Sequence, residues 1–370
     1  MYYFDNSATT PVKPEILDLI NQINNDVYGN ASSIYSSGKK SRTLIEEARY
    51  EVANSIKANP EQIIFTSGGT EANNQVLWSL LKKNCVHVIS NKIEHSAVNK
   101  VLSYLSNLGL EYTFADLNND GSISIDSILK NIKKNTSLIC LMMANNEIGS
   151  IQPLKEVIEI ARKKQIMVHT DAVQCMGKME LNVSKLGVDF LTLSAHKFYG
   201  PKGVGALYAK NPKKLSPLIL GGGQENGLRA GTESIALIAG MGLACKIACS
   251  SLNDHKKLLN ELETYFKERL KRITSKIIYN GNQKNKIPGL INIAFPGHKS
   301  NIMMAALDRA GIAVSNGSAC ASGVVKLSPV LSALDLEDDL NLSSIRFSFG
   351  AFNTKKEIDY LIGQLKLVLN

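Results

Sequence analysis

The sequence lacks the features that mark membrane, secreted and metal-binding proteins. No apolar run approaches the length of a membrane span, and the amino terminus has no basic region followed by an apolar core. The six cysteines form neither a CxxC pair nor a regular framework, and the histidines have no close paired-ligand spacing. We therefore expect free thiols, no resident metal site and a cytoplasmic protein without a membrane segment.

Basic residues are in excess, but they are not concentrated. The 42 lysines and arginines exceed the 33 acidic residues and give a net charge of +9. These cations are scattered in short pairs without interleaved aromatic residues, which argues against direct nucleic-acid binding. The same excess suits an anionic cofactor or an acidic partner. At 370 residues and 44% hydrophobic content, the chain can bury a substantial core and a cofactor pocket.

Short apolar runs alternate with amphipathic segments between about residues 60 and 210. This alternation predicts an α/β fold with a mainly parallel sheet and helical crossovers. The predicted strands are 63–66, 86–90, 112–115, 138–142, 166–170, 190–194 and 205–208, and the predicted helices are 71–82, 97–108, 125–133 and 154–163. Ligands bind at the carboxyl ends of the strands in such sheets, so we expect the functional site there.

A long helical region over residues 234–271 leaves this unit and leads into a mixture of strands and helices. Its apolar segments are 277–279, 290–295, 302–310, 312–314 and 345–348, a mixture of strands and helices. This pattern is typical of a smaller α+β domain. We expect a large domain over residues 14–255 and a small domain formed by residues 1–13 plus 256–370.

Lys197 is the most informative single residue. It follows the predicted strand 190–194 and lies among a serine, a histidine and closely spaced glycines. A lysine in that setting suits a Schiff base with a carbonyl cofactor such as pyridoxal 5'-phosphate (PLP), because a pocket of this kind desolvates the amine. Standing alone, the motif favours an ordinary lysine in a turn.

Three further segments suit the same cofactor. The run Phe65-Thr-Ser-Gly-Gly-Thr-Glu-Ala72 opens a predicted helix whose amino terminus can bind a phosphate, although an N-cap turn is the alternative. Ser194 and His196 form a second phosphate-suited cluster. Asp171, at the end of a predicted strand, can pair with a protonated pyridine nitrogen, and Gln174 can bond the ring hydroxyl. Taken alone, Asp171 is better explained as the cap of a following helix.

Taken together, the motifs resemble the NifS/IscS-type cysteine desulfurases of the class-V aminotransferase family. They occur in order from Tyr3 to about Leu361, and they comprise Tyr3-Phe-Asp-Asn-Ser-Ala-Thr-Thr-Pro11, Gly29-Asn-Ala-Ser-Ser33, Thr66-Ser-Gly-Gly-Thr-Glu-Ala-Asn-Asn74, Ile93-Glu-His-Ser-Ala-Val98, Asn145-Asn-Glu-Ile-Gly149, His169-Thr-Asp-Ala-Val-Gln174, Ser194-Ala-His-Lys197, Gly221-Gly-Gly-Gln-Glu225, Arg229-Ala-Gly-Thr-Glu233, Gly317-Ser-Ala-Cys320 and Ile345-Arg-Phe-Ser-Phe-Gly350. The resemblance implies a PLP enzyme of aspartate aminotransferase-like fold (fold type I). It also implies a homodimer that converts L-cysteine to L-alanine.

The resemblance also assigns a role to each matching site residue. Lys197 would hold PLP and then act as general base, Asp171 would pair the ring nitrogen, and His95 would stack on the ring and assist proton transfer. Asn146 and Gln174 would contact the cofactor, and its phosphate would be held by Gly69, Thr70, Ser194 and His196. Thr232 would reach the phosphate of the neighbouring subunit, and Arg346 with Asn146 would bind the substrate.

Cys320 would attack the substrate sulfur and carry it as a persulfide. The segment from Ser315 to Gly323 is all small or polar, which is typical of an exposed loop where a thiolate can act. The stretch from Cys320 to Ser344 is long, as in the family branch whose cysteine loop reaches a sulfur acceptor. We therefore expect transfer to a protein such as an iron–sulfur scaffold or a tRNA-thiolation enzyme. By the same resemblance, Cys320 would serve as a transient iron–sulfur ligand with a partner.

Other functions stay open at the level of sequence. One is a different PLP reaction, such as that of a selenocysteine lyase, another lyase or an aminotransferase, and the other is a non-catalytic binding platform on the PLP fold. Ala31 and Tyr35 stand where the family often has proline and histidine, and Asn370 follows the last expected helix without the tail that some relatives use to dock a scaffold. Cys175, beside Gln174, is a second candidate thiol.

Overall fold

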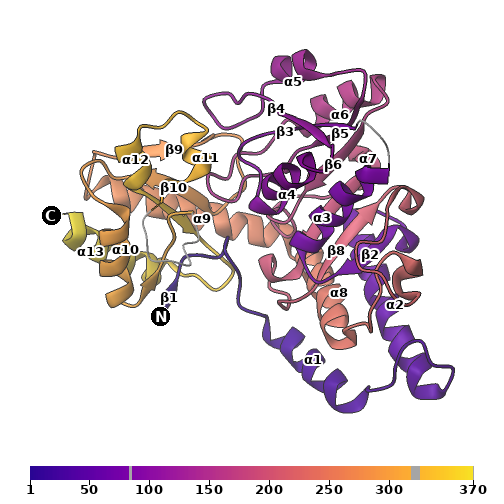
Figure 1. Ribbon diagram of the computed structural model, residues 1–370. Coiled ribbons are helices and arrows are strands. Elements are labelled where there is room, and N and C mark those ends of the chain that lie inside the picture. The colour runs from indigo at the N-terminus through magenta and orange to yellow at the C-terminus, as the bar shows by residue number, and fades with distance from the viewer. Residues whose placement is uncertain (83–85, 318–325, 370) are drawn as a thin grey trace.

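The computed structural model describes residues 1–82, 86–317 and 326–369, and its largest element is a seven-stranded sheet (Figure 1). The strands of this sheet are β2 (Ile63–Thr66), β3 (His87–Ser90), β4 (Glu111–Phe114), β5 (Thr136–Cys140), β6 (Met167–Asp171), β7 (Phe190–Ser194) and β8 (Gly205–Ala209). Their spatial order is β2-β8-β7-β6-β5-β3-β4, and β8 runs antiparallel to both of its neighbours. The sheet is therefore mainly parallel, and the α/β prediction is confirmed.

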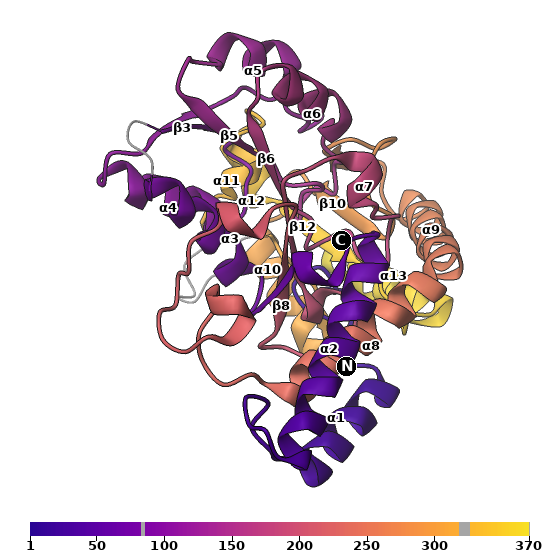
Figure 2. The same cartoon turned by 90° about the vertical axis from the view of Figure 1, so that its right-hand side faces the viewer.

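Helices cover both faces of the sheet because successive strand residues point into two different apolar cores. In β2, Ile63 and Phe65 belong to one core and Ile64 belongs to the other. The first core receives side chains from α1 (Pro14–Asp26), α2 (Ser36–Ile56), α5 (Ile125–Asn131), α6 (Leu154–Lys163), α7 (Val183–Leu186) and α8 (Ile235–Ser250), and the second from α3 (Gly69–Trp78) and α4 (Ser96–Ser106). Figure 2 shows α3 and α4 on one side of the strands and α7 on the other.

The helical region predicted over residues 234–271 is two helices, α8 and α9 (Leu252–Lys271), bent by 72° at their junction. The break has a physical cause, since α8 packs between α1 and α2 while the apolar residues of α9 enter a separate core. In the part of the chain described here, no helix is by itself long and apolar enough to cross a membrane, and only this bent pair reaches that length and composition together.

A third core lies among the carboxyl-terminal elements. It contains Phe266 of α9, Phe347 and Leu361, all fully buried. The elements around it are β9 (Ile278–Asn280), β10 (Leu290–Ala294), α10 (Ser300–Arg309), β11 (Ile312–Ala313), β12 (Ser344–Ser348) and α13 (Lys355–Leu369). Two short helices, α11 (Pro329–Ser332) and α12 (Asp338–Leu342), precede β12, and α11 packs in a separate small cluster with Ile93 and Ile148. The antiparallel sheet has the order β12-β10-β9.

The amino-terminal strand belongs with these carboxyl-terminal elements. β1 (Tyr2–Tyr3) pairs in parallel with β11, and Phe4 is buried in the same core as Phe266. Figure 1 shows the chain crossing from β1 to α1 on the other side of the molecule. From this separation of cores we propose the division into residues 14–255 and residues 1–13 plus 256–370.

Candidate active site

A cavity of about 1140 Å³ opens at the carboxyl ends of the parallel strands. Its walls come from residues that follow β2, β3, β5, β6 and β7 and, from the smaller core, from α10, β11 and β12. The cavity brings together Gly69, Thr70, His95, Asn146, Asp171, Gln174, Ser194, His196, Lys197 and Arg346. Residues more than 270 positions apart thus meet in one cleft between the two parts of the chain.

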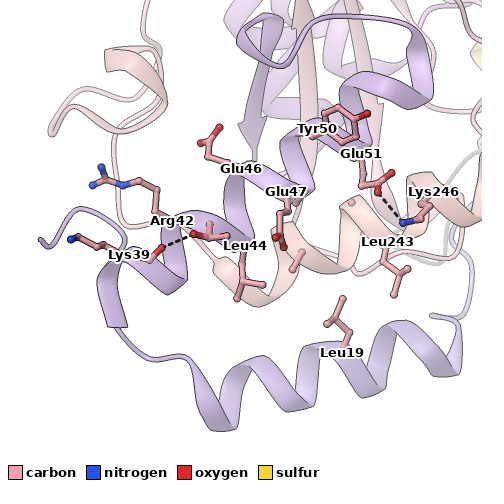
Figure 3. A pocket seen from close by; sticks show the side chains of 14 residues that line it. Leu19, Lys39, Arg42, Leu44, Glu46, Glu47, Tyr50, Glu51, Leu243 and Lys246 are labelled. Atoms are coloured by element: carbon pink, nitrogen blue, oxygen red, sulfur yellow. Dashed lines mark hydrogen bonds and ion pairs between the residues drawn. The ribbon is translucent and has the colours of Figure 1, made fainter. Parts of the chain in front are cut away.

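A second hollow, of about 880 Å³, lies between α1, α2 and α8 (Figure 3). Leu19, Leu44 and Leu243 border it, and a Lys246–Glu51 ion pair of 3.0 Å lies at one end. None of the predicted site residues that the structure describes lines this hollow. The chemistry is therefore assigned to the larger cavity at the sheet edge.

Lys197 ends a short 3-10 turn that directly follows β7. Its Nζ donates hydrogen bonds to the backbone oxygens of Ser7 and Ala8, both at 2.7 Å. Burial, together with the positive charges of Arg346 and Lys178, lowers the pKa of Lys197 to about 7. A large fraction of this amine is therefore uncharged at neutral pH, which is the form that attacks a carbonyl carbon.

Asp171 is the last residue of β6, and its carboxylate is buried. One oxygen accepts a hydrogen bond from Asn73 Nδ2 at 2.7 Å and the other from the backbone N–H of Val173 at 3.0 Å. No lysine or arginine among the described residues forms an ion pair with it. The alternative of a helix cap is wrong, because turns rather than a helix follow β6.

The cradle for an anion lies at the start of α3. This helix begins at Gly69 without a side-chain cap, so its first N–H groups face the cavity beside Thr70 and Ser194. His196 completes the cradle, with its Nδ1 3.1 Å from Thr9 Oγ1. Burial and the charges of Lys197 and Lys202 lower the pKa of His196 to about 4, so the ring is neutral near pH 7.

Arg346 lies in the middle of β12 and is buried. One terminal nitrogen binds Asp5 Oδ1 at 2.6 Å, and the other donates to the backbone oxygen of Asn146 at 2.9 Å. Its Nε is buried and has no hydrogen-bond partner among the described residues. A guanidinium that is fixed on one side and has unused donor capacity is suited to a carboxylate ligand.

His95 and Gln174 border the same cavity. His95 is the N-cap of α4, where its Nδ1 accepts the N–H of Ala97 at 3.1 Å. Desolvation lowers the pKa of His95, outweighing the opposite effect of Asp171. Gln174 donates from Nε2 to the backbone oxygen of Ser7 at 2.9 Å.

Glu94 and Asn73 are site residues that the sequence reasoning missed. Both lie inside motifs quoted above, and Asn73 holds the Asp171 carboxylate. Glu94 accepts from Asn91 Nδ2 at 3.0 Å, while its Oε2 is buried and has no partner within the described part of the chain. Burial raises the pKa of Glu94 to about 8, so this carboxyl is mostly protonated near pH 7. The only sequence signal for Glu94 was its position directly before His95, a predicted site residue.

Three predicted residues differ from the rest in their placement. Thr232 is exposed and does not line the cavity of its own chain. Cys175 is fully buried with a raised pKa, which is unfavourable for a reactive thiolate. Cys320 lies outside the described residues, although Gly317 and Pro329 on either side of that gap border the cavity.

The residues present fit the PLP that the sequence resemblance implies. An anion cradle at α3, an unpaired buried carboxylate at Asp171 and a partly uncharged lysine at Lys197 match the phosphate, ring nitrogen and aldehyde of that cofactor. The unpartnered Nε of Arg346 leaves a donor for the carboxylate of an amino-acid substrate. The cavity is also large enough for both molecules.

Comparison with known proteins gives consistent matches along the chain. The family model Aminotransferase class-V matches residues 2–361. The chain is 42% identical to "Cysteine desulfurase IscS" of Dictyoglomus turgidum, over 99% of this chain and 94% of that protein. It is 41% identical to "Cysteine desulfurase, mitochondrial" of Candida maltosa, over 97% and 75%. A solved "NIFS-LIKE PROTEIN" superposes with a TM-score of 0.93 at 33% identity, over 100% and 99% of the two chains.

Proposed function

The chain belongs to the class-V aminotransferase family and, within it, to the PLP-dependent cysteine desulfurases, and on that premise we propose a residue-level mechanism for it. In this proposal the protein converts L-cysteine to L-alanine and keeps the sulfur as a persulfide on Cys320. The observation that carries the proposal is the single cavity shared by Lys197, Asp171 and Arg346. Those side chains supply the amine, the ring partner and the carboxylate clamp that the reaction needs.

The described residues divide the work of binding and proton transfer. Gly69, Thr70, Ser194 and His196 hold the cofactor phosphate, and Arg346 holds the substrate carboxylate so that Cα faces Lys197. Lys197 Nζ then removes the Cα proton as general base. When bound, PLP supplies an electron sink for the pair released at Cα, and the Asp171 carboxylate strengthens that sink by pairing the ring nitrogen.

The sulfur step balances without an external oxidant. The thiolate of Cys320 attacks the substrate sulfur, so a sulfur–sulfur bond forms while the bond between Cβ and sulfur breaks. The carbon fragment keeps the electron pair and takes up a proton at Cβ, which is reduced to the methyl group of alanine. The two sulfur atoms are oxidised together to a persulfide, and the thiol hydrogens account for the protons taken up.

Mass spectrometry after incubation with L-cysteine tests the proposal. We expect one added sulfur atom, about 32 Da, on the peptide that contains Cys320, with one alanine formed for each persulfide. Cys320→Ala should retain the cofactor absorption and lose both the added sulfur and alanine formation. Alanine formation from cysteine that survives in Cys320→Ala would instead favour another PLP reaction, such as a selenocysteine lyase-type reaction or an aminotransferase reaction.

We further propose that a protein acceptor removes the sulfur for iron–sulfur cluster assembly or for tRNA or cofactor thiolation. The long stretch between Cys320 and the start of β12 supports transfer to another protein. A pulldown with persulfide-loaded protein labelled with ³⁵S identifies the acceptor. Release of all label as free sulfide in the presence of a cell extract would contradict a protein acceptor.

We also propose a cytoplasmic homodimer. Free thiols at Cys140, Cys175, Cys245 and Cys249 suit a reducing compartment. Exposure of Thr232 away from its own cavity supports a role across a subunit interface. Cell fractionation and sedimentation of the purified protein test the two parts separately.

A further inference from the structure

We propose that Lys178 is a positioning residue for the active site: its ammonium sets the orientation of the Gln174 amide and places a second positive charge behind Lys197. This inference rests on the proposed function, since it assigns a role within the same reaction. Lys178 is only 7% exposed, yet no carboxylate among the described residues pairs with it. A buried cation without a counter-ion is costly, so its position calls for a reason beyond stability.

The contact between Lys178 and Gln174 determines how the amide is turned. Lys178 Nζ lies 3.3 Å from Gln174 Oε1, and an ammonium can only donate. The oxygen of the amide must therefore face Lys178, and its Nε2 must face the cavity side, where it donates to Ser7 O. Gln174 is in this way fixed as a hydrogen-bond donor toward a cofactor oxygen.

The same hydrogen bonds connect Lys178 to Lys197. Ser7 O accepts from Gln174 Nε2 at 2.9 Å and from Lys197 Nζ at 2.7 Å. Lys178 and Lys197 also border one smaller cavity, of about 360 Å³, whose other walls include Tyr199 and His255. The two amines are therefore linked through Gln174 and Ser7 O and share one cavity.

The other charges around Lys197 do not mask the effect of Lys178 on its pKa. Arg346 adds a positive charge that is partly offset by its ion pair with Asp5, and Asp171 adds a negative one. His95 and His196 have lowered pKa values and are neutral near pH 7. Burial is the main cause of the lowered pKa of Lys197, and Lys178 follows Arg346 among the charges that add to it.

Lys178 itself keeps much of its charge at neutral pH. Burial lowers its pKa to about 8, and the nearby Cys175 thiol and Arg346 modify this value in opposite directions. His255, whose Nδ1 lies 2.8 Å from Gly177 O, also has a lowered pKa and adds little charge. An apolar side chain of similar length at position 178 would remove the cation and leave the packing almost intact.

Competitive acetylation of the cofactor-free full-length protein measures the ionisation of Lys197 directly. The rate for the Lys197 peptide is followed from pH 5.5 to 10 and normalised to exposed lysines. In Lys178→Met we expect the midpoint of Lys197 to rise by about one pH unit, because the like charge that disfavours the protonated amine is removed. Lys178→Arg should keep the midpoint within about 0.3 unit of wild type because the charge is retained.

Lys13→Met is the matched control. Lys13 borders the same smaller cavity, but it is not among the charges that act on Lys197. In Lys13→Met the pH midpoint for acetylation of Lys197 should stay at the wild-type value. An unchanged midpoint in Lys178→Met, or an equal shift in Lys13→Met, would overturn the proposal. If Lys178→Met does not fold, Lys178→Gln provides the same comparison with a neutral polar side chain.

A second readout separates this inference from the desulfurase assignment. In the PLP-loaded protein, the pH midpoint of the visible absorption band should rise in Lys178→Met and return in Lys178→Arg. An inactive wild-type protein with these shifts would refute the proposed function and keep the role of Lys178. An active protein whose midpoints do not move would refute the role of Lys178 alone.

Discussion

At the scale of single residues, burial decides which side chains can do chemistry. Lys197, His196 and Glu94 are ordinary titratable residues in the sequence. Desolvation lowers the pKa of Lys197 and of His196 and raises the pKa of Glu94, and in each case it favours the uncharged form. The result near pH 7 is a partly neutral amine, a neutral imidazole and a mostly protonated carboxyl in one cavity. Perturbed groups that gather in a cleft are typical of an active site.

The buried amine of Lys197 should make the cofactor-free protein less stable than it would otherwise be. Its pKa is about 7 in the folded chain against 10.5 for a free lysine, so the unfolded chain binds more protons between these values. The penalty is therefore full below pH 7, declines as pH rises and is absent above pH 10.5. We expect Lys197→Met to raise the melting temperature at pH 7, with a gain that shrinks toward pH 10. A gain that grows with pH would contradict this sign.

Arg346 should be sensitive even to replacement by lysine. Asp5 and Asn146 O hold the guanidinium in one plane, and a lysine ammonium cannot reproduce that fork. Arg346→Lys should lower kcat/KM for L-cysteine by about 100-fold, mainly through KM, because the substrate carboxylate loses its fixed orientation. The exposed-loop change Arg272→Lys is the control and should have no effect. Equal kinetics for both variants would exclude Arg346 as the carboxylate clamp.

The sequence was most informative where motif residues act at strand ends. Asp171, Ser194 and Lys197 could be assigned because the strands before them were predicted and parallel strands end at one edge. Lys178 and the ionisation of Glu94 could not be predicted. Both depend on burial by residues far away in the chain, which no local pattern records.

At the scale of elements, the phosphate cradle depends on how closely β8 approaches the start of α3. A Cβ atom on Gly205 would lie 2.7 Å from backbone atoms of Gly68 and from Leu193 O. Backbone atoms cannot move aside as a flexible side chain can, so β8 or the turn before α3 would have to shift. The proposed cofactor site therefore requires that position 205 carry no side chain.

Gly205→Ala should weaken cofactor binding without touching any residue that contacts the cofactor. We expect the Kd for PLP, measured by fluorescence titration, to rise about tenfold, and the melting temperature to fall by several degrees. Gly363→Ala in α13 is the matched control, because a Cβ there meets no atom within 4 Å and alanine favours a helix. Tight PLP binding in Gly205→Ala would show that the close approach is not required.

The segment before Thr232 is held by a buried ion pair. Arg49 of α2 binds both oxygens of Glu225, at 2.7 and 2.8 Å, and the backbone N–H of Phe65 donates to the same carboxylate at 2.8 Å. Arg49→Met should destabilise the fold by about 3 kcal/mol, because Glu225 is left buried and unpaired. Adding Glu225→Gln should recover part of that loss in urea unfolding. Additive losses in the double variant would contradict coupling between the two side chains.

The predicted bounds of helices and strands were accurate where the spacing of apolar residues agreed with the turn residues that flank the element. The ranges predicted for β2, β7 and α6 are confirmed to the residue. The predicted helical region 234–271 is helical as α8 and α9, but the bend between them was not predicted, because a local apolar pattern cannot indicate which core a helix enters. The antiparallel direction of β8 was likewise set by tertiary pairing rather than by its own residues.

At the scale of the whole molecule, the active site exists because two separately packed parts meet. Lys197 and Asp171 belong to the large sheet, whereas Arg346 is carried by β12 of the smaller one. The amino-terminal segment links them, since Asp5 binds Arg346 while Ser7 O and Ala8 O accept from Lys197. In the proposed mechanism, a substrate between Arg346 and Lys197 would therefore contact both parts at once.

The surface around α2 carries large apolar side chains that a single chain leaves in water. Tyr28 and Ile34, before the helix, are each 88% exposed, and Leu220, in the segment that leads to Thr232, is 81% exposed. Burying such residues is a main source of stability in homodimers. This exposure supports the proposed dimer.

A charged side chain at Ile34 or Leu220 should both separate the subunits and weaken cofactor binding. Ile34→Asp and Leu220→Asp should change the sedimenting species from dimer to monomer at about 10 μM, because an unpaired carboxylate in an interface is strongly unfavourable. Leu367→Asp is the control, since Leu367 is 71% exposed on α13, far along the chain from this surface. If Thr232 completes the neighbouring phosphate site, PLP should dissociate about tenfold faster from the two monomeric variants, and wild-type retention of PLP by a monomer would show that each subunit holds its cofactor alone.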